Sequence, residues 1–429
     1  MLENYLVKKV AGPIDWTVTV PGSKSMTNRA LLLAALSNEK VELEGVLFSD
    51  DSRHFLSSLK SLGFEVEIDE AEKKVEIVGC NGTIPKKEAT IHVGSAGTAA
   101  RFLTAMLGCS DGCYQIDASE QMKKRPMKPL FDLLSSMGAE ITYLEKEGFL
   151  PIRIRGMAAK EEVKVTLDIS KSTQFLSAML LVSPMLKHGL FIEISSEKKD
   201  GSYIRITRNM MDEFGVCVDF DGSCYKVAPG AMYRKKNYVI EPDMSAACYF
   251  YGAAAITGGR ATVRNVHMDN TQGDLKFLSV LEKIGCEVED NEIGVTVSGP
   301  QNGAISGIDI NMNDFSDQTM TLAALAPFAD GPVHIHGIGH IRLQESDRIH
   351  GIVTELTRLG IRCEEEEAAI TIYPGEVKTG VVETYDDHRM AMAFALIGLR
   401  ADGIEIHDPG CCRKTFEEYF EVLTKLLEA

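Results

Sequence analysis

Short polar clusters precede runs of small and apolar residues at several points in the 429-residue chain, and some of these clusters contain cations. The first lies in PGSKSMTNRALLLAAL and contains Lys24, Ser25 and Arg29. A helix start offers unpaired N–H groups and the positive end of a dipole, so it binds anions. The G-x-x-x-x-G-K-[ST] pattern of a Walker A loop is absent. The segment therefore indicates either an anion site or a capped helix with surface cations.

Two further clusters supply neutral groups that suit an anion. In GSAGTAARF, the glycines let a ligand approach the backbone at a helix start. In SKSTQFLSAML, hydroxyl and amide groups suit a phosphate without adding charge. Each cluster alone also fits an ordinary capped turn, because Ser and Thr are common N-caps. The residues concerned are Gly94, Ser95, Gly97, Thr98, Arg101, Ser170, Ser172, Thr173 and Gln174.

Clusters in the second half of the chain add carboxylates. Asp317 stands before the helix predicted in NDFSDQTMTLAAL, where an Asp commonly interacts with the helix dipole. YDDHRMAMAFAL places Asp386, Asp387, His388 and Arg389 before an apolar helix, and the His-Arg pair there indicates an anion site. The remaining cluster, in EPDMSAACY, has no cation, and we expect it to be structural.

Three segments outside these helices carry further charges: KKRPMKPL with Arg125, RLQESDRI with Glu345 and Arg348, and CCRKTF with Lys414. Lys414 stands at a predicted helix start, where a cation opposes the dipole and needs an anionic partner. Together the cations predict a site for two small polyanions, in which Asp317 and Glu345 are candidates for proton transfer. No set of His, Cys and Asp has metal-ligand spacing, so we expect no metal.

The elements that must position these clusters recur along the chain. An amphipathic helix that ends in Gly and leads into a strand appears five times. Each Gly suits a left-handed position after the last helical turn. The glycines are Gly63, Gly138, Gly215, Gly285 and Gly360, at spacings of about 70–77 residues. The runs of small and apolar residues that follow the polar clusters predict a second kind of helix, apolar on every side. The two kinds together predict six repeats, each with one buried and one solvent-facing helix.

The sixth repeat reaches the end of the chain before its closing strands. We expect IDWTVTVPG near the N-terminus to supply them, so that residues 1–21 complete the last repeat. Three repeats then form a domain of residues 22–241, and three form a second domain of residues 242–429 plus 1–21, with hinges near 21–22 and 241–242. A solenoid binding module is the alternative, but different polar residues at equivalent places favour one shared site.

Composition narrows the class of function. The formal net charge is −17, which argues against nucleic-acid binding. No apolar stretch approaches the roughly 18 residues of a membrane span, and the N-terminus lacks the apolar core of a signal peptide. We therefore expect a cytoplasmic protein without membrane contact. The ten cysteines form no C-x-x-C pair and indicate buried thiols, with the reactivity of Cys411 and Cys412 left open.

The motifs resemble those of the 5-enolpyruvylshikimate-3-phosphate synthase family, in order and over essentially the whole chain. They are PGSKSMTNRALLLAAL, SAGTAARFL, the Arg-Pro of KKRPMKPL, STQFLSAML, QESDRI, YDDHRMAM and CCRKTF. The resemblance implies an α/β fold, a two-domain inside-out α/β barrel of six βαβαββ repeats, three per domain. It also implies a transferase that acts without metal or organic cofactor. Nothing in the sequence demands more than a monomer, so we expect a monomer.

The implied reaction moves the enolpyruvyl group of phosphoenolpyruvate to the 5-hydroxyl of shikimate 3-phosphate. It releases phosphate by addition and elimination through a tetrahedral intermediate. This step belongs to the shikimate pathway, which leads to chorismate and the aromatic amino acids. Glyphosate competes with phosphoenolpyruvate in this family, and because Gly97 has no side chain to crowd that pocket, we expect inhibition here.

The resemblance implies roles for individual residues. Asp317 would accept the hydroxyl proton, Glu345 would protonate the methylene carbon, and Lys24 would assist at the oxygen or the leaving phosphate. The residues holding phosphoenolpyruvate would be Lys24, Gly97, Arg125, Gln174, Arg348, Arg389 and Lys414. The residues holding shikimate 3-phosphate would be Lys24, Ser25, Arg29, Ser172, Thr173, Gln174, Tyr203, Asp317 and Gln344.

Several positions depart from the family pattern. Gln344 stands where the family usually has Lys, His340 replaces a frequent Asn, Ser95 a usual Asn and Phe102 a usual Pro. The nearest alternative is UDP-N-acetylglucosamine enolpyruvyl transferase, whose active-site loop usually carries a Cys that ASEQMKKRPMKP lacks. A catalytically inactive anion-binding module is the alternative from another class.

Overall fold

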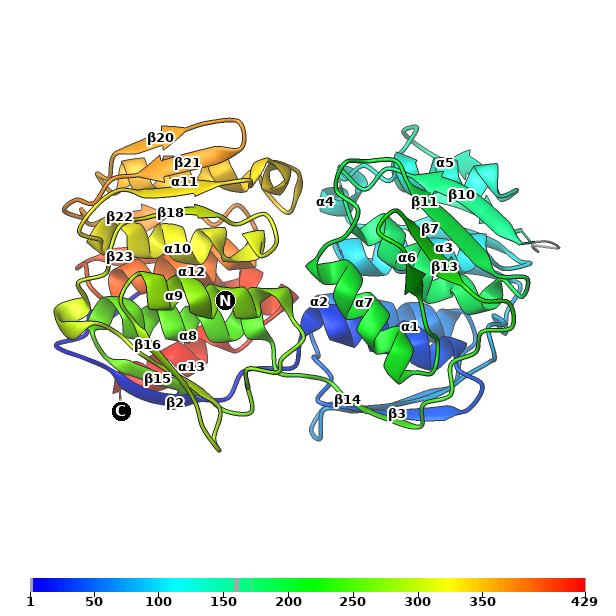
Figure 1. The fold of residues 1–429 in the computed structure, drawn as a ribbon, viewed down its shortest axis with the longest axis horizontal. Helices are drawn as coiled ribbons and strands as arrows, with labels where there is room; N and C mark the ends of the chain where they lie inside the picture. The colour runs from blue at the N-terminus through cyan, green and yellow to red at the C-terminus, as the bar shows by residue number, and fades with distance from the viewer. Residues whose placement is uncertain (1–2, 158–161, 171, 429) are drawn as a thin grey trace. The chain divides into compact units, whose positions relative to one another are not determined.

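The chain divides into two compact units in this computed structural model (Figure 1). The continuous unit is Gly22–Glu241, and the split unit combines Met1–Pro21 with Pro242–Ala429. The chain passes from one unit to the other at Pro21–Gly22 and at Glu241–Pro242. The structure describes residues 3–157, 162–170 and 172–428.

Three four-stranded sheets form the outer layer of the continuous unit. In each sheet a parallel pair of strands is followed by two antiparallel neighbours. Alternate residues of strands such as β7 are buried, so one face of the sheet covers the helices. In order across each sheet, the strands are β14 (Asn237–Val239), β3 (Lys40–Glu44), β5 (Lys74–Val78) and β4 (Val66–Asp69); β6 (Glu88–His92), β7 (Cys113–Asp117), β9 (Ile152–Arg155) and β8 (Glu140–Tyr143); and β10 (Val163–Leu167), β11 (Leu190–Ile194), β13 (Cys224–Val227) and β12 (Asp219–Phe220).

Three helices that are apolar on nearly every side pack together inside the continuous unit: α1 (Lys24–Leu36), α3 (Gly97–Gly108) and α6 (Gln174–Val182). Every residue of α3 is buried, as a helix without a polar face requires. The other helices keep a solvent-facing side or are short. They are α2 (Asp50–Ser61), α4 (Glu120–Lys123), α5 (Lys128–Ser136), α7 (Ser202–Glu213) and the 3₁₀ helix η1 (Ser183–Met185).

The split unit repeats this arrangement with two four-stranded sheets and one of three strands. Its buried helices are α8 (Met244–Thr257), α10 (Thr319–Leu325) and α12 (His388–Gly398), which contact one another. The strands, in order across each sheet, are β2 (Asp15–Val18), β15 (Arg260–Val263), β17 (Val295–Ser298) and β16 (Glu287–Asp290); β18 (Ile308–Asn311), β19 (Val333–His336), β21 (Ala369–Ile372) and β20 (Cys363–Glu365); and β22 (Gly380–Val382), β23 (Ile404–His407) and β1 (Asn4–Leu6).

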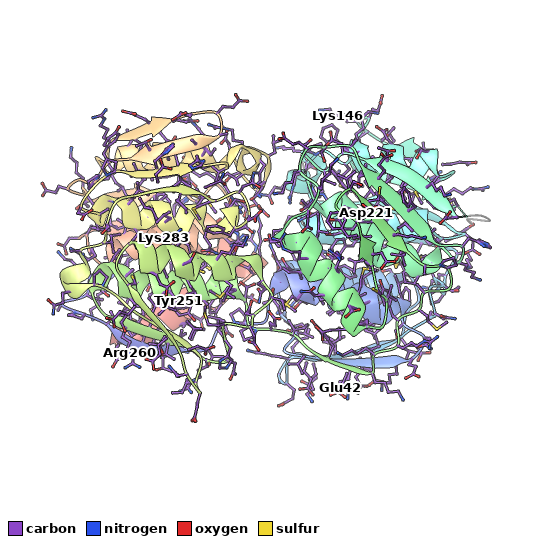
Figure 2. All side chains as sticks on the ribbon, viewed as in Figure 1. Glu42, Lys146, Asp221, Tyr251, Arg260 and Lys283 are labelled. Atoms are coloured by element: carbon purple, nitrogen blue, oxygen red, sulfur yellow. The ribbon has the colours of Figure 1, made fainter. Side chains whose placement is uncertain are left out.

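Tyr251 of α8 illustrates the packed interior of the split unit, because its hydroxyl donates to the carbonyl of Val295 at 3.2 Å (Figure 2). Lys283 and Arg260 are instead exposed. The remaining helices are α9 (Phe277–Lys283), α11 (Arg348–Arg358) and α13 (Tyr419–Glu428), with the 3₁₀ helices η2 (Gly273–Lys276), η3 (Gln301–Gly303), η4 (Ser316–Gln318), η5 (Ala326–Phe328), η6 (Gly339–Leu343) and η7 (Pro409–Lys414).

The strand of IDWTVTVPG does not complete the sixth repeat, and that expectation was wrong. Its strand β2 pairs in parallel with β15 in the sheet of the fourth repeat. The sixth sheet is closed by β1, which runs antiparallel to β23. The alternating pattern of IDWTVTVPG predicts a strand but not its partner, because strand pairing depends on long-range contacts.

The glycine positions predicted after the amphipathic helices are confirmed. Gly63, Gly138, Gly215, Gly285 and Gly360 all have φ between +85° and +109°. At the first of them, the N–H of Gly63 donates to Lys60 and the N–H of Phe64 donates to Leu59, which closes a Schellman motif. These caps end each helix sharply and turn the chain into the next strand. In the described part of the chain, no helix is long and apolar enough to cross a membrane.

Candidate active site

A buried arginine forms the centre of a charged cluster in the split unit. Arg348 is the first residue of α11, which begins there because Asp347 accepts a hydrogen bond from the N–H of His350. The side chain of Arg348 is 1% exposed. Its Nε donates to Asp387 at 2.8 Å, and its Nη2 donates to Glu345 at 3.0 Å and to Asp387 at 3.3 Å. Its Nη1 donates to Asp317 at 3.0 Å and to Gln344.

The five N–H donors of a guanidinium all have acceptors at Arg348. Burial by itself lowers the pKa of this side chain. The carboxylates of Asp387, Glu345 and Asp317 outweigh burial and raise the pKa of Arg348 above its usual value. The cation is therefore permanent, and its interactions are saturated by the protein itself.

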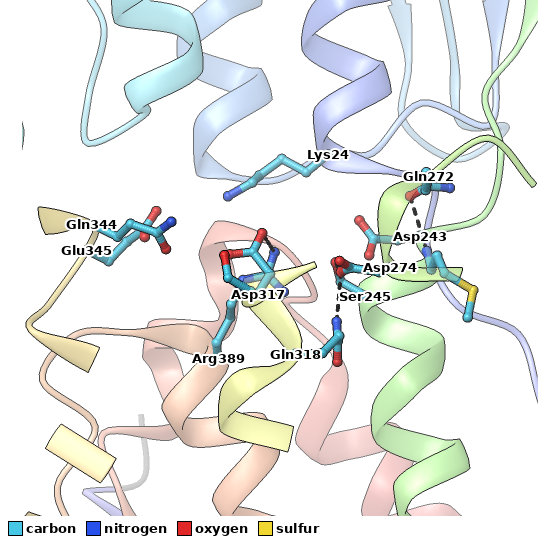
Figure 3. Close-up of polar contacts among 12 residues, drawn as sticks. Lys24, Asp243, Ser245, Gln272, Asp274, Asp317, Gln318, Gln344, Glu345 and Arg389 are labelled. Carbon is cyan, nitrogen blue, oxygen red and sulfur yellow. Dashed lines mark hydrogen bonds and ion pairs between the residues drawn. The ribbon is translucent and has the colours of Figure 1, made fainter. Parts of the chain in front are cut away.

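Asp317 lies at the meeting point of two arginines. It belongs to η4, directly before α10, and its side chain is 12% exposed. One carboxylate oxygen accepts from Arg348, and the other accepts from Nη2 of Arg389 at 2.9 Å. Arg389 is the second residue of α12, so the starts of α10, α11 and α12 converge on this carboxylate (Figure 3).

The segment before α12 holds Asp387 in an unusual backbone geometry. Tyr385 and Asp386 have φ of +57° and +53°, a region that residues other than Gly rarely adopt. The hydroxyl of Tyr385 donates to the buried Glu355. Asp387 then caps α12 by accepting from the N–H of Arg389 at 3.0 Å. The strained turn aims the Asp387 carboxylate at Arg348.

Lys414 fixes the same turn from the other side. Its Nζ donates to the carbonyl of Asp386 at 2.7 Å and lies 3.0 Å from the Asp386 carboxylate. The expected anionic partner is thus present, but the expected helix start is not. Lys414 ends η7 and α13 begins only at Tyr419, so the cation stands at a C-terminal end, where the dipole favours it.

The neighbouring thiols of Cys411 and Cys412 are buried. Burial raises the pKa of Cys412, and the adjacent Cys411 adds to the effect. A thiol that does not ionise is a poor nucleophile. Special reactivity, which the sequence left open, is therefore not expected of Cys412.

In the continuous unit, Arg29 forms no ion pair with a carboxylate among the residues that the structure describes. Its side chain is almost completely buried in α1, where Nε donates to the hydroxyl of Thr207 at 2.8 Å. The two other nitrogens donate to the carbonyls of Ser25 at 2.9 Å and Tyr203 at 3.1 Å. The ring of Phe102 lies 5.3 Å from the guanidinium carbon. Burial lowers the pKa of Arg29 to about 10, so the side chain stays charged at neutral pH.

A second group of predicted residues meets at the start of α3. A Cβ atom on Gly97 would lie 2.6 Å from the guanidinium of Arg125 and 2.7 Å from that of Arg101. Arg101 donates through Nη1 to the side-chain oxygen of Gln174, the first residue of α6. The absence of a side chain at Gly97 thus leaves room for two arginine heads.

The remaining predicted residues lie at helix starts of the continuous unit. Lys24 begins α1, and its Nζ lies 3.7 Å from Asp51 of α2. Ser172 accepts from the N–H of Gln174 at 3.3 Å, and Thr173 is the N-cap of α6. Tyr203 lies in the first turn of α7. The predicted positions of these polar residues at helix starts are confirmed. Their binding of a ligand stays a prediction.

Several residues of these clusters were not assigned a role from the sequence. Asp387 and Arg101 were visible in their motifs, but nothing indicated that Asp387 would face Arg348 or Arg101 would hold Gln174. Asp51 and Asp274 stand at the starts of amphipathic helices, where acidic residues are common and carry no special signal. His340, which departs from the family pattern, bonds Ser316 at 2.8 Å. Within the described ranges, no group of His, Cys, Asp and Glu could hold a metal ion.

Comparison with known proteins identifies the family. The family model for EPSP synthase (3-phosphoshikimate 1-carboxyvinyltransferase) matches residues 8–423. A 3-phosphoshikimate 1-carboxyvinyltransferase of Trichormus variabilis is 42% identical over 99% of this chain and 100% of its own length. A chloroplastic relative of the same name from Arabidopsis thaliana is 39% identical over 96% of this chain and 82% of its own length.

Solved structures agree on the fold. The EPSP synthase from Acinetobacter baumannii superimposes with a TM-score of 0.83, covering 99% of this chain and 98% of that chain at 24% identity. A two-domain α/β architecture with helices inside the sheets is therefore shared with that enzyme. The chain belongs to the EPSP synthase (3-phosphoshikimate 1-carboxyvinyltransferase) family.

Proposed function

We propose that this enzyme transfers the enolpyruvyl group of phosphoenolpyruvate to the 5-hydroxyl of shikimate 3-phosphate and releases phosphate. The relatives that match over the whole chain carry the name of this activity. The observation that carries the mechanism is the position of Asp317, a partly exposed carboxylate held between Arg348 and Arg389. We further propose that the enzyme works as a monomer in the cytoplasm.

Both substrates are small polyanions, and we propose that the cations and hydroxyls named above bind them. Arg29 suits the phosphorylated substrate, because its contacts with the described residues are to neutral oxygens and aromatic rings. The residues for shikimate 3-phosphate are Lys24, Ser25, Arg29, Ser172, Thr173, Gln174, Tyr203, Asp317 and Gln344. The residues for phosphoenolpyruvate are Lys24, Gly97, Arg125, Gln174, Arg348, Arg389 and Lys414.

The saturation of Arg348 has a consequence for binding. Because its five donors already have acceptors, an incoming anion reaches Arg348 only by displacing one of them. Asp387 is fully buried, whereas the side chain of Glu345 is 18% exposed. We therefore propose that Glu345 and Gln344 give way to the substrate and Asp387 does not.

This exchange would prepare the proton donor. Contact with a guanidinium favours the charged form of a carboxyl group, but Glu345 must carry a proton to act as an acid. When a substrate anion replaces Glu345 at Arg348, the carboxyl group loses that contact and gains a negative neighbour. Both changes favour proton uptake, so binding of the substrate and loading of the acid are coupled.

The addition step then proceeds with all atoms accounted for. Glu345 gives its proton to C3 of phosphoenolpyruvate, the 5-oxygen bonds to C2, and Asp317 accepts the hydroxyl proton. Fixed cations stabilise the resulting tetrahedral intermediate. In the elimination step, C3 returns a proton to Glu345, the double bond re-forms, and the bond between C2 and the phosphate oxygen breaks. The phosphate leaves with the proton from Asp317, a step that Lys24 would assist, and both carboxyl groups are restored.

Phosphate release tests the proposal directly. Purified enzyme is mixed with phosphoenolpyruvate and either shikimate 3-phosphate or UDP-N-acetylglucosamine, without added metal. Release only with shikimate 3-phosphate is expected. Release only with the sugar nucleotide would overturn the choice of acceptor, and release with neither would favour an inactive binding module.

Two variants test the roles of the carboxyl groups. Asp317→Asn and Glu345→Gln should each lower kcat by about 10²–10⁴-fold, the usual contribution of a general acid or base. The matched control is Asp314→Asn, which alters a surface carboxylate paired with Lys276. It should keep wild-type kcat. Wild-type kcat in either of the first two variants would contradict the assigned role.

A further inference from the structure

A fourth carboxylate of this site, Asp274, lies close to Asp317, and among the residues that the structure describes no cation forms an ion pair with it (Figure 3). Asp274 belongs to η2 and is 7% exposed. One of its oxygens, Oδ2, accepts from Nε2 of Gln318 at 2.7 Å and also from the hydroxyl of Ser245 (Figure 3). Gln318 directly follows Asp317 and caps α10, and Ser245 is the second residue of α8. The Oδ2 atom of Asp274 therefore bonds residues at the starts of both α10 and α8.

The side chain of Gln318 is fixed at both ends. It is fully buried, and its oxygen accepts from the hydroxyl of Thr321 at 2.9 Å. That bond leaves the amide nitrogen for Asp274. The residue next to Asp317 thus has one orientation, and Asp274 is the acceptor that completes it.

The segment around Asp274 is also anchored to the chain where it enters α8. The buried Gln272 donates through Nε2 to the carbonyl of Pro242 at 2.7 Å. Its side-chain oxygen accepts from the N–H of Met244 at 3.2 Å. Asp274 therefore stands on a segment that cannot shift without moving the start of α8.

The charges around Asp274 come from three elements. Asp317 on η4 and Arg389 on α12 act on it electrostatically, and Cys248 of α8 lies near it. Asp243, the N-cap of α8, also lies nearby (Figure 3). Burial, followed by the negative charge of Asp317, raises the pKa of Asp274 to about 6, against the opposing effect of Arg389. At neutral pH the folded protein therefore holds a charged carboxyl group where a neutral side chain would be more stable.

We propose that Asp274 is a positioning residue for Asp317: it orients Gln318 and the start of α10, and its negative charge makes Asp317 a stronger base. This inference rests on the proposed function, in which Asp317 accepts the proton of the 5-hydroxyl. An anion near a carboxylate favours its protonated form. Asp274 thereby offsets part of the effect of Arg348 and Arg389, which would otherwise leave Asp317 a weak base.

The test is Asp274→Asn, which removes the charge while the amide oxygen can still accept from Gln318 and Ser245. We expect kcat to fall about tenfold while KM for both substrates stays within about twofold, because the affected group acts in proton transfer. Wild-type kcat/KM should fall about tenfold as the pH is lowered through about 6, because Asp274, with a pKa of about 6, then takes up a proton and no longer strengthens Asp317 as a base. This step should be absent from Asp274→Asn.

The melting temperature separates this role from a purely structural one. Replacing a residue that only stabilises the fold would lower the melting temperature. The folded pKa of Asp274 lies above its unfolded value, so its effect on stability is favourable below pH 3.8 and is lost as the pH rises through about 6. Asp274→Asn should therefore melt no lower than wild type at pH 8. The surface variant Asp314→Asn should change neither kcat nor the pH profile.

The outcomes separate the two proposals. If wild type releases phosphate and Asp274→Asn shows wild-type kcat and the same fall in kcat/KM near pH 6, the inference about Asp274 is wrong and the proposed function stands. If wild type releases no phosphate, the proposed function fails first. Should Asp274→Asn fail to fold, Gln318→Met takes over the test, because it removes the donor at similar volume. It should lower kcat at least about fivefold, and wild-type kcat would overturn the inference.

Discussion

Arg348 in the split unit and Arg29 in the continuous unit are both almost completely buried, yet their surroundings are opposite. Arg348 contacts three carboxylates, which raise its pKa. Arg29 contacts a hydroxyl, two carbonyls and aromatic rings, and burial lowers its pKa. In the described part of the chain, no carboxylate forms an ion pair with Arg29.

The difference indicates two ways of using a buried cation. Among the described residues no carboxylate pairs with Arg29, so under the proposed function it would bind a dianion without first releasing a carboxylate. Arg348 is neutralised in advance and can bind an anion only by exchange. We therefore expect Arg29 to govern affinity and Arg348 to couple binding to the state of Glu345.

Removal of Arg348 should have the largest effect. Arg348→Gln removes the arginine from the fully buried Asp387, whereas Asp317 keeps its contact with Arg389. Breaking a buried pair costs about 3–5 kcal/mol of unfolding free energy. Urea denaturation and phosphate release should show both this loss and a fall in kcat of at least about 10³-fold. Arg362→Gln, at an exposed pair with Glu364, is the control and should change neither. If Arg348→Gln unfolded with the wild-type free energy, the proposed difference between Arg348 and Arg29 would be wrong.

Arg29→Met should change affinity rather than stability. Loss of a charge-assisted contact with phosphate should raise KM for shikimate 3-phosphate about 100-fold. The unfolding free energy should stay within about 1 kcal/mol, because no buried carboxylate loses its partner. Steady-state kinetics and urea denaturation of the same preparation test both parts. A stability loss as large as that of Arg348→Gln would show that the two arginines are equivalent.

Gly97→Ala tests the crowding at the start of α3. The new methyl group would lie within 2.8 Å of both Arg125 and Arg101, so the two guanidinium groups must shift. Because a misplaced binding group weakens one substrate selectively, KM for phosphoenolpyruvate should rise about tenfold while KM for shikimate 3-phosphate changes little. Gly12→Ala, at a position with open space around it, is the matched control. Equal changes in both KM values would contradict the assignment.

Gln344→Lys should have the smallest effect, and it tests directly whether exchange at Arg348 limits substrate binding. The change removes an acceptor from Arg348 and adds a cation, so exchange at Arg348 becomes easier. KM for the anionic substrates should fall about threefold at low salt and less at high salt, since exposed charges are screened. Gln301→Lys places the same charge on an exposed residue and should leave KM unchanged. A higher KM in Gln344→Lys would show that the amide acceptor matters more than the charge.

Much of the fold and of the site could be predicted from the sequence because the relevant signals are local. Gly63 and its equivalents end amphipathic helices at the expected left-handed positions. The apolar residues of α1 and α12 predicted buried helices, and the polar residues before them predicted which ends would carry Lys24 and Arg389. Helix caps, hydrophobic periodicity and charge at helix starts all depend on residues within a few positions of one another.

Only the tertiary structure decided the rest, because it depends on which distant segments meet and how deeply they are buried. The sequence predicts a strand at Asp15–Val18, but the sheet pairs that strand with Arg260–Val263. It places Arg348 beside Glu345, but not beside Asp387 of α12. It gives no signal for Asp274, whose contact with Gln318 spans 44 positions. Strand partners, the saturation of a guanidinium and the pKa of a buried carboxyl group are properties of packing, so no local pattern encodes them.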